Sequence, residues 1–589
     1  MTTQNIKENE IENFIYLQAL ENALSFNGQA NIKPIFGKTI STFPRIKEDL
    51  EFYKNLINNI VKQVNEMNNE EQKKKLLKFN TNFFKESQEK KSKNVQDKTQ
   101  LIDLPQIPEK FIGRFAPAPS GHLHIGHISG IVFNYEYKKK YDGKFILRIE
   151  DTNPDNIKLE NYDKIIEDVK WLTDDGIDEI YYQSDRIDIY YKYLRQLIQT
   201  GYAYVCECDS DTFKVFNDSS QACPHRDRDI ERQTYLFEKF FREKDPYQDG
   251  QACIRFKGDL NNKNPALRDF PIARLNSNPH PRTQTKYKLW PMYNFAVSID
   301  DNLMGITYII RGKDSEINAI RQDMIKKALG FKTIPYYHFG RIQFSDIELG
   351  KTPIKKKIEE GIYTGWDDPR VPTLISFKKR GFKAKAFRDM IINMGISNRD
   401  RKMLEKEYFK SLNYFNKQIL EKESNRRFFI VDPKIVIIKD ITKYPQKEII
   451  LPKHPEYKER GNRKFPISNK YYIDKIDWEN INKFDIIRLM HFANFKVIEK
   501  NDKEIELEYL SKDFDRKLKL KRNIHFLPTN KEYYNDAIII MQSAQKLKGL
   551  SENLDNPKIN KSIQFERFGF VRFDSLNKNG SYLFYFTHR

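Results

Sequence analysis

The residues with the most specific chemistry lie in one stretch of small, proline and histidine residues. It runs Arg114-Phe-Ala-Pro-Ala-Pro-Ser-Gly-His-Leu-His-Ile-Gly-His127 and leads from a predicted strand into a predicted helix. Small residues let a backbone approach a ligand closely, and the amino end of a helix favours phosphate. His124 and His127 could donate hydrogen bonds to phosphate oxygens whose charge grows during a displacement reaction. Two other interpretations stay open, a histidine-rich turn and a metal-binding His-x-x-His pair, although no acidic or thiol ligand is close in sequence.

A second group of residues has the spacing of a metal site. Cys206-Glu-Cys208 is followed by Cys223-Pro-His225, so four soft or borderline ligands fall within twenty residues. Four such ligands are enough to close a tetrahedral zinc site, which would be structural because the protein fills every position. The alternative is a set of buried thiols without a metal. Cys253 is left over and is interpreted as a core residue.

The elements around the histidine stretch predict a parallel sheet. A strand at Phe111–Phe115, a proline- and glycine-rich loop, a helical stretch after His127 and a strand at Lys144–Ile149 form a βαβ unit. Alternating α/β character returns between Tyr293 and Ile310. The polar segment around 210–290 is therefore predicted to be an insertion in a nucleotide-binding fold.

The remaining chain divides by composition. The first hundred residues are polar and helix-like, and 67–100 reads as a charged helix or a mobile connector. Prolines around Leu104–Pro108 mark a boundary, and helical patterns dominate 370–425. From Arg427 onward, regularly spaced short strands suggest β-barrels. The predicted strands are Phe428–Val431, Ile435–Ile438, Glu504–Glu508, Leu518–Lys521 and Tyr582–Phe586.

Length and charge limit the class of protein. The 589 residues are enough for roughly four domains. Lys and Arg number 102 against 82 Asp and Glu, a net charge of +20 that favours a polyanionic partner such as nucleic acid, unless it reflects a lysine-rich background. Four cysteines are too few for a disulfide framework, the amino end lacks an apolar signal core, and no apolar run approaches the ~20 residues of a membrane span. We therefore expect a cytoplasmic protein.

Six motifs in order carry a resemblance to a known family. The histidine stretch resembles the His-Ile-Gly-His signature of class I aminoacyl-tRNA synthetases, and its surroundings are similar to the glutamyl/glutaminyl subgroup in its archaeal-type form. The similarity covers roughly residues 110–440. The five supporting stretches are Leu147-Arg-Ile-Glu-Asp-Thr-Asn-Pro154, Asn264-Pro-Ala-Leu-Arg-Asp269, Trp290-Pro-Met-Tyr-Asn-Phe-Ala296, Ile310-Arg-Gly-Lys-Asp314 and Gly365-Trp-Asp-Asp-Pro-Arg-Val-Pro-Thr373.

The resemblance implies a multidomain α/β plus β architecture. Its parts are a Rossmann-type parallel-sheet catalytic domain, an inserted acceptor-stem-binding domain, a helical connecting domain, C-terminal anticodon-binding β-barrels and a helical N-terminal extension. We expect the N-terminal extension at 1–104, the two catalytic halves at 105–200 and 291–355 around an insertion at 201–290, the connecting domain at 356–425 and the barrels at 426–589.

The resemblance also implies roles for individual residues. Arg114 would bind a substrate carboxylate, and Glu150 would accept from the substrate ammonium group. Tyr293 and Arg311 would close the pocket around the side chain. A guanidinium at 311 suits a γ-carboxylate, and the glutaminyl branch typically lacks it, which favours glutamate over glutamine. Internal salt bridges are the alternative for Glu150 and Arg311. The implied set is Arg114, Ala116, Glu150, Tyr293 and Arg311 for glutamate, and Pro117, His124, Gly126, His127 and Lys351 for ATP, with His124, His127 and Lys351 catalytic.

One segment departs from the family pattern. The family carries a mobile loop of the Lys-Met-Ser-Lys-Ser type, and Leu349-Gly-Lys-Thr-Pro-Ile354 corresponds to it here. Lys351 keeps the first basic position, but Pro353 replaces the second, so either the run Lys355–Lys357 substitutes or activation is weakened. That run could also be a solvated helix face.

The implied activity is ATP-dependent activation of glutamate and its transfer to tRNA(Glu), with Mg²⁺ on the ATP phosphates and zinc in some family members. A monomer without membrane contact is expected. The alternatives are a glutaminyl enzyme, a glutamyl enzyme that also charges tRNA(Gln), and a catalytically idle RNA-binding scaffold.

Overall fold

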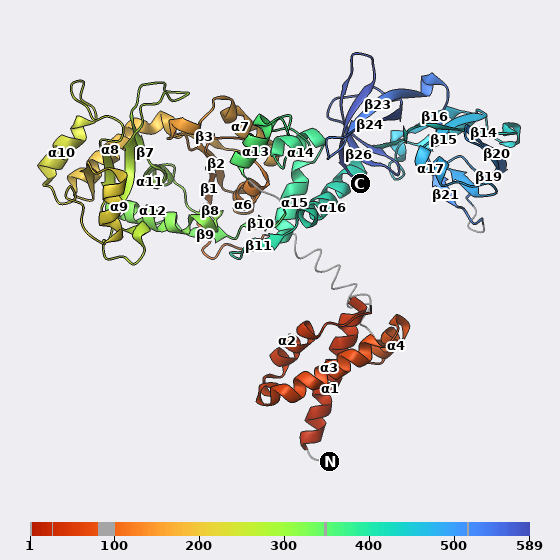
Figure 1. Ribbon diagram of the computed structural model, residues 1–589, viewed down its shortest axis with the longest axis horizontal. Coiled ribbons are helices and arrows are strands. Elements are labelled where there is room, and N and C mark those ends of the chain that lie inside the picture. Colours follow the sequence, from red (N-terminus) through yellow and green to blue (C-terminus); the bar gives the residue numbers. More distant parts are fainter. Residues whose placement is uncertain (1–2, 26–27, 80–100, 347–349, 515–517) are drawn as a thin grey trace. The chain divides into compact units, whose positions relative to one another are not determined.

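A computed structural model describes residues 3–25, 28–79, 101–346, 350–514 and 518–589 (Figure 1). The chain divides into two units, Met1–Gln100 and Leu101–Arg589. The first unit is helical, as the sequence predicts. The helices among its described residues are α1 (Thr3–Ser25), α2 (Ile32–Thr42), α3 (Leu50–Asn65) and α4 (Asn69–Phe79).

The helical unit packs around its own apolar core. In α3 the buried residues Ile57, Ile60, Val61 and Val64 recur at helical spacing and form one face, and the Asp49 side chain caps the helix by accepting from Phe52 N–H. Of the charged segment predicted at 67–100, α4 covers Asn69–Phe79, and residues 80–100 lie outside the described residues.

The second unit begins with a parallel sheet split by an insertion. Strands β1, β2 and β3 pair in parallel, as do β8 and β9. The pair β8–β9 lies beside β1, since the N–H of Thr307, just before β8, donates to Ile112 O in β1 (3.0 Å). The spatial order is therefore β3-β2-β1-β8-β9. The strands are β1 (Ile112–Phe115), β2 (Lys144–Ile149), β3 (Glu179–Tyr182), β8 (Ile309–Gly312) and β9 (Tyr336–Phe339).

Helices cover this sheet and connect its strands. The buried side of α6 packs against β1, β2 and β8, and contributes Ile128, Ile131 and Val132 to a core that includes Phe145 and Leu147. The helices of this part are α6 (Ile125–Lys140), α7 (Glu160–Leu172), α8 (Ile187–Gln199), α11 (Tyr293–Leu303) and α12 (Glu316–Ala328).

The insertion between β3 and β8 carries an antiparallel sheet in the order β4-β5-β6-β7. Trp290 is fully buried in its core, and its indole N–H donates to Asn276 O (3.1 Å). The elements are β4 (Ala203–Cys206), α9 (Ser210–Asp218), α10 (Ile230–Lys239), β5 (Cys253–Phe256), β6 (Phe270–Leu275) and β7 (Leu289–Pro291).

A helical segment follows the parallel sheet. Buried side chains of α14, α15 and α16, among them Phe377, Phe387 and Leu412, extend the core of the parallel sheet. The elements are β10 (Ile342–Phe344), α13 (Lys351–Glu359), α14 (Leu374–Arg380), α15 (Ala384–Met394), β11 (Arg401–Met403) and α16 (Glu405–Glu423).

Two seven-stranded sheets form the C-terminal part, in agreement with the predicted barrel-type architecture. One has the order β12-β25-β26-β27-β23-β24-β13 and the other β21-β18-β19-β20-β14-β17-β22, beside a small β15-β16 pair. Their elements are β12 (Asn425–Arg427), β13 (Phe429–Val431), β14 (Lys434–Ile438), β15 (Glu448–Pro452), β16 (Asn462–Pro466), β17 (Lys470–Ile473), α17 (Lys475–Glu479), β18 (Ile486–Leu489), β19 (Ala493–Lys500), β20 (Glu504–Ser511), β21 (Arg522–Ile524), β22 (Leu527–Pro528), β23 (Tyr534–Ile540), β24 (Lys546–Glu552), β25 (Ser562–Phe565), β26 (Gly569–Leu576) and β27 (Tyr582–His588).

One predicted strand of this part is wrong. Leu518–Lys521 is irregular, and the strand β21 begins only at Arg522. Leu518 and Leu520 alternate with lysines, but both leucines are only half-buried. The alternating pattern therefore does not correspond to a strand face that packs on the core.

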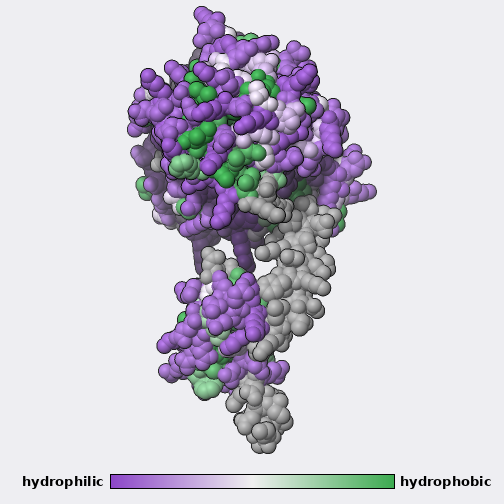
Figure 2. Space-filling view, turned by 90° about the vertical axis from the view of Figure 1, so that its right-hand side faces the viewer, coloured by the Kyte–Doolittle hydropathy of each residue, from purple (hydrophilic) through white to green (hydrophobic). Residues whose placement is uncertain are grey.

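The face of the molecule that Figure 2 shows is predominantly hydrophilic. On the face shown in Figure 2, hydrophobic residues form limited groups among hydrophilic ones. Among the helices that lie in the described ranges, none combines the length and the apolarity needed to cross a membrane.

Candidate active site

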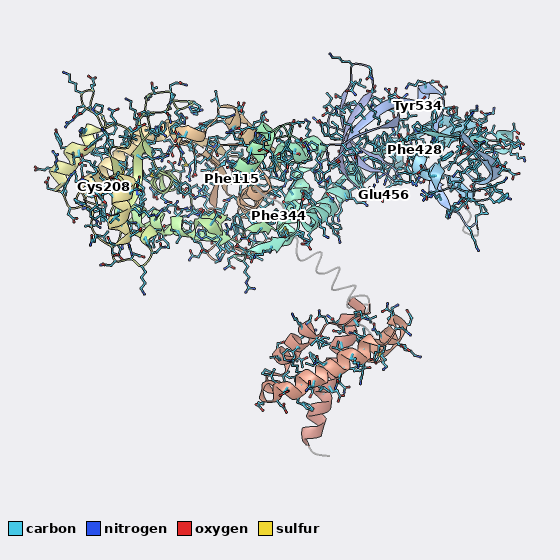
Figure 3. All side chains as sticks on the ribbon, viewed as in Figure 1. Phe115, Cys208, Phe344, Phe428, Glu456 and Tyr534 are labelled. Carbon is cyan, nitrogen blue, oxygen red and sulfur yellow. The ribbon has the colours of Figure 1, made fainter. Side chains whose placement is uncertain are left out.

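A cavity of about 430 Å³ opens at the carboxyl ends of β1 and β8. The chain runs outward from β1 to β2 and β3 on one side and from β8 to β9 on the other, so these ends form the switch point where parallel sheets commonly bind ligands. Phe115, Phe339 and Phe344 supply apolar wall, and Figure 3 labels the first and last of them. Seven of the residues predicted from the sequence line it, namely Arg114, Ala116, His124, Gly126, His127, Tyr293 and Arg311.

The two histidines cap the helix that leads away from the cavity. Helix α6 begins at Ile125, earlier than the sequence suggests, so His124 is its N-cap and His127 lies in its first turn. Gly126 N–H donates to His124 Nδ1 (3.1 Å), and His124 N–H donates to His127 Nδ1 (3.2 Å). Because Nδ1 accepts in both rings, each neutral imidazole carries its proton on Nε2. The capping contacts thus leave two N–H donors on adjacent rings, whose centroids are 4.1 Å apart.

Both imidazoles are held in the neutral form. Burial lowers the pKa of His124 to about 4, and the positive charge of Lys351 acts in the same direction. Burial also lowers the pKa of His127 well below its ordinary value. The pair can therefore donate hydrogen bonds near neutral pH without adding positive charge to the helix terminus.

Arg114 is held by a carboxylate of the protein. Its Nε and Nη2 each lie 3.1 Å from an oxygen of Asp301 in α11, and Arg148 Nη1 lies 2.7 Å from the same carboxylate. All three side chains are buried. Burial alone would raise the pKa of Asp301, but Arg114 and Arg148 hold it well below its usual value. Asp301 therefore fixes Arg114 as a charged, immobile guanidinium.

Glu150 follows the end of β2 and borders the same network without lining the cavity. Arg148 Nη2 donates to its carboxylate (3.2 Å), so the internal salt bridge considered from the sequence is present. Burial raises the pKa of Glu150 to about 7, because Arg148 and Arg114 offset it only in part. The backbone N–H of Glu150 donates to Pro117 O (2.9 Å), which ties the end of β2 to the loop after β1.

Arg311 contrasts with Arg114, because its contacts are all neutral. Nε lies 3.4 Å from His338 Nε2, Nη1 3.4 Å from Tyr293 Oη and Nη2 3.4 Å from Ser315 O. Within the part of the chain that the structure describes, no carboxylate pairs with this guanidinium. Burial lowers the pKa of Arg311, as expected for a buried positive charge without a counter-ion. The cavity therefore contains a guanidinium suited to a ligand anion.

Lys351 contacts the loop that precedes the two histidines. Its Nζ donates to Ser120 Oγ (2.9 Å) and to Ala118 O (3.3 Å), and burial lowers its pKa. It does not line the cavity and opens helix α13, in which Pro353 occupies the first turn. A proline there loses no helical hydrogen bond, so it is compatible with the local fold. Lys355–Lys357 continue this helix, and Lys355 and Lys356 pair with glutamates one turn later.

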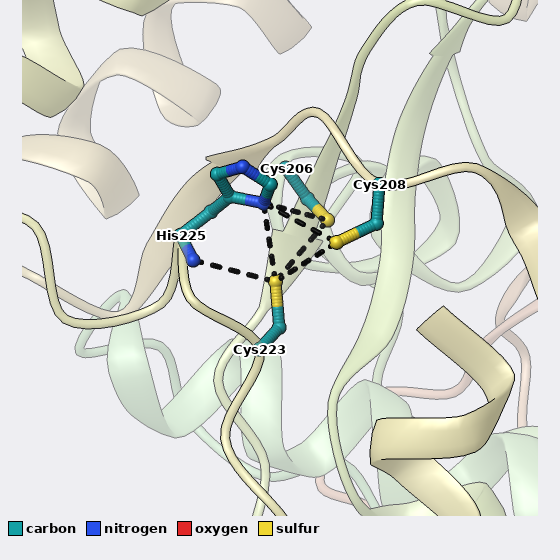
Figure 4. Close-up of side chains that lie close together, drawn as sticks. All are labelled: Cys206, Cys208, Cys223 and His225. Carbon is teal, nitrogen blue, oxygen red and sulfur yellow. Dashed lines mark hydrogen bonds between the residues drawn. The ribbon is translucent and has the colours of Figure 1, made fainter. Parts of the chain in front are cut away.

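The cysteine cluster lies in the inserted domain, apart from the cavity (Figure 3). The sulfurs of Cys206, Cys208 and Cys223 and the ring of His225 point toward one another (Figure 4). Cys223 Sγ lies 3.6 Å from Cys206 Sγ and 3.5 Å from Cys208 Sγ, and His225 Nδ1 lies 3.8, 3.3 and 3.3 Å from the sulfurs of Cys206, Cys208 and Cys223. Cys253, interpreted from the sequence as a core residue, is half-buried, packs against the buried cluster that includes Cys206 and Cys223, and faces Cys206 across the β4–β5 pair.

Comparisons with known proteins identify the family of this chain. The family model "tRNA synthetases class I (E and Q), catalytic domain" matches residues 110–422, and the corresponding anti-codon binding domain matches 424–513. This chain belongs to that family. A glutamate–tRNA ligase of Pyrococcus furiosus is 38% identical over 98% of this chain and 100% of the relative. Those of Methanocaldococcus jannaschii and Methanobrevibacter smithii are 37% and 36% identical, over 97% and 99% of this chain and 99% and 100% of theirs.

Two residues that shape the candidate site were not identified from the sequence. Asp301 lies with Asp300 directly after the mostly apolar stretch Phe295–Ile299 of α11, and an acidic residue that is buried with such a stretch requires a paired charge. His338 lies in β9, in a stretch that matches no motif, and only the pairing of β9 with β8 brings it to Arg311.

Proposed function

We propose that this synthetase is a glutamate–tRNA ligase whose cavity at β1 and β8 binds glutamate and ATP. The observation that carries the choice of amino acid is the buried Arg311 guanidinium with neutral contacts only. A γ-carboxylate supplies the negative charge that the contacts of Arg311 lack. A γ-amide leaves the positive charge of Arg311 uncompensated and places its NH₂ group near other donors.

The rest of the amino-acid site surrounds Arg311. Asp301 uses Nε and Nη2 of Arg114, and Nη1 stays available for the substrate. Tyr293 extends the pocket beside Arg311, and Ala116 leaves room for the substrate backbone. We assign Glu150, which lies just outside the cavity lining, to the α-ammonium group, from which its ionised carboxylate would accept. Because burial raises the pKa of Glu150 to about 7, this carboxylate loses its negative charge, and with it this interaction, as the pH falls below neutrality.

Activation proceeds by in-line attack of the glutamate α-carboxylate on the α-phosphorus of ATP, and pyrophosphate leaves. His124 and His127 donate from Nε2 to phosphate oxygens, which gain charge as the bond to pyrophosphate breaks. Positioning and charge stabilisation account for such chemistry without a protein nucleophile.

Other groups hold the nucleotide. Gly126 lines the cavity and lets the backbone approach ATP closely. We assign Pro117, which follows the lining residue Ala116 but does not itself line the cavity, to the same nucleotide site. Lys351 reaches the departing pyrophosphate from the loop at Ser120. Mg²⁺ accompanies ATP and neutralises part of the phosphate charge. In the second step a ribose hydroxyl of the terminal adenosine of tRNA(Glu) attacks the adenylate carbonyl, and AMP leaves.

The cysteine cluster fits structural zinc. A tetrahedral ion with Zn–S of about 2.3 Å and Zn–N of about 2.0 Å separates two sulfurs by about 3.8 Å, and sulfur from nitrogen by about 3.5 Å. The five measured separations of 3.3–3.8 Å lie close to these values. Cys206, Cys208, Cys223 and His225 would hold the ion and so fix the loops of the inserted domain, which we assign to the tRNA acceptor stem.

The partner is tRNA(Glu), held from the inserted domain to the C-terminal sheets by a monomer in the cytoplasm. Charging assays with pure tRNA(Glu) and tRNA(Gln), each with glutamate and with glutamine, test this function. Glutamate attached to tRNA(Glu) supports it, and glutamate on tRNA(Gln) as well would extend the substrate range. Preferential attachment of glutamine, or no tRNA-dependent ATP–pyrophosphate exchange despite tRNA binding, would refute it.

Arg311→Ala tests the amino-acid pocket in the same assay. We expect the preference for glutamate over glutamine to fall about a hundredfold, because the only unpaired guanidinium described in the cavity is lost. The matched control is Arg399→Ala, which removes an exposed guanidinium outside the cavity. An unchanged preference in Arg311→Ala would remove this residue from the pocket.

A further inference from the structure

His338 lies behind Arg311, outside the cavity lining. Strands β8 and β9 pair in parallel with Arg311 opposite His338 and Ile309 opposite Tyr336. Because side chains alternate along a strand, Tyr336 and His338 share one face of β9. That face supports the guanidinium, and His338 reaches substrate only through Arg311.

The contact from His338 is a neutral one. Arg311 Nε donates to His338 Nε2, so this nitrogen is unprotonated and the ring proton is on Nδ1. Burial lowers the pKa of His338, and the Arg311 charge lowers it further. The imidazole therefore orients the guanidinium without neutralising it. Arg114, by contrast, forms an ion pair with Asp301.

Tyr336 holds the imidazole in place. The two rings are stacked, with centroids 5.5 Å apart and an interplanar angle of 9°. The Tyr336 hydroxyl donates to Asp323 (2.8 Å) and accepts from Lys326 (2.8 Å), both in α12. Arg311 Cζ lies 5.2 Å from the Tyr336 ring centroid. The guanidinium is thus supported by a tyrosine face that is itself anchored at its far end.

We propose that His338, held by Tyr336, is a positioning residue that orients Arg311 and keeps its charge free for the γ-carboxylate of glutamate. This inference rests on the proposed function. A neutral acceptor at 338 aims the guanidinium and preserves its charge, whereas a carboxylate there would pair with Arg311 and weaken the preference for glutamate.

Three substitutions at this position separate orientation from charge. His338→Ala removes the acceptor, and we expect KM for glutamate to rise about tenfold while KM for ATP changes less than twofold. His338→Gln keeps a neutral acceptor oxygen and should restore most of the affinity. His338→Glu places a carboxylate beside Nε of Arg311. It should lower the ratio of kcat/KM for glutamate to kcat/KM for glutamine about tenfold or more.

The matched control is Tyr337→Phe, because Tyr337 is on the opposite face of β9 and packs against the core of the parallel sheet. KM values come from tRNA-dependent ATP–pyrophosphate exchange, and circular dichroism melting checks the fold of each variant. Equal rises in both KM values, no recovery in His338→Gln, or an unchanged ratio in His338→Glu would overturn the proposal. Wild-type protein that prefers glutamine would instead refute the proposed function, which distinguishes the two failures.

Discussion

Replacement of Asp301 by asparagine tests whether the buried ion pair positions the amino-acid site. Asp301 is fully buried and accepts three charge-assisted hydrogen bonds, two from Arg114 and one from Arg148. Asparagine keeps the shape but leaves two buried guanidinium groups without this counter-ion. Removal of one partner of a buried ion pair costs about 3–5 kcal/mol, so the melting temperature should fall by several degrees. Because Arg114 lines the cavity, kcat/KM for glutamate should also fall about a hundredfold, or about 2.7 kcal/mol.

The neighbouring Asp300 provides the matched control. It is equally buried and accepts from Gln183, Arg186 and Tyr190, none of which lines the cavity. Asp300 also lies 3.9 Å from Arg148 Nε, but it has no ion pair with Arg114 among the described residues. Asp300→Asn should lower the melting temperature by a similar amount and change KM for glutamate much less. KM values are measured by tRNA-dependent ATP–pyrophosphate exchange at a temperature where both variants are folded. If both substitutions alter KM for glutamate equally, Asp301 stabilises the fold and does not specifically position Arg114.

Three further predictions concern the histidine pair and the cysteine cluster. His127→Ala should slow tRNA-dependent ATP–pyrophosphate exchange about a hundredfold and leave the Kd for tRNA within twofold; equal losses would contradict a transition-state role. Cys223→Ser should abolish a zinc content of about one ion per chain, measured by mass spectrometry, whereas Cys253→Ser should retain it. The pKa of His124 is about 4 in the folded protein and about 6.5 in the unfolded chain, so as the pH falls below about 6.5 the imidazole is protonated in the unfolded chain before it is protonated in the folded one. Stability should therefore decline between pH 6.5 and 4 more steeply in wild type than in His124→Asn, which still caps the helix; parallel melting curves would argue against a buried neutral imidazole.

Local pattern was a good guide where one strong signal dominated. The strand Lys144–Ile149 has the predicted bounds because five of its six side chains are buried, and the glycine and proline content before α6 marked the loop. It failed at Leu518–Lys521, where alternation alone suggested a strand. Nothing in those four residues reveals whether a partner strand and a core lie beside them.

The sequence by itself determined the motifs and their order along the chain, and these identify the family. It also determined the candidate residues, namely the histidine pair, the four possible zinc ligands and a guanidinium at 311. Only the tertiary structure decided how Arg114 and Arg311, two of the three arginines that line the cavity, differ. Arg114 is paired because α11 carries Asp301 against it, and Arg311 is not, because β9 places the neutral His338 beside it. Both partners come from distant segments of the chain. The physical reason is that charge compensation depends on separations of about 3 Å in space, which spacing along a sequence does not specify.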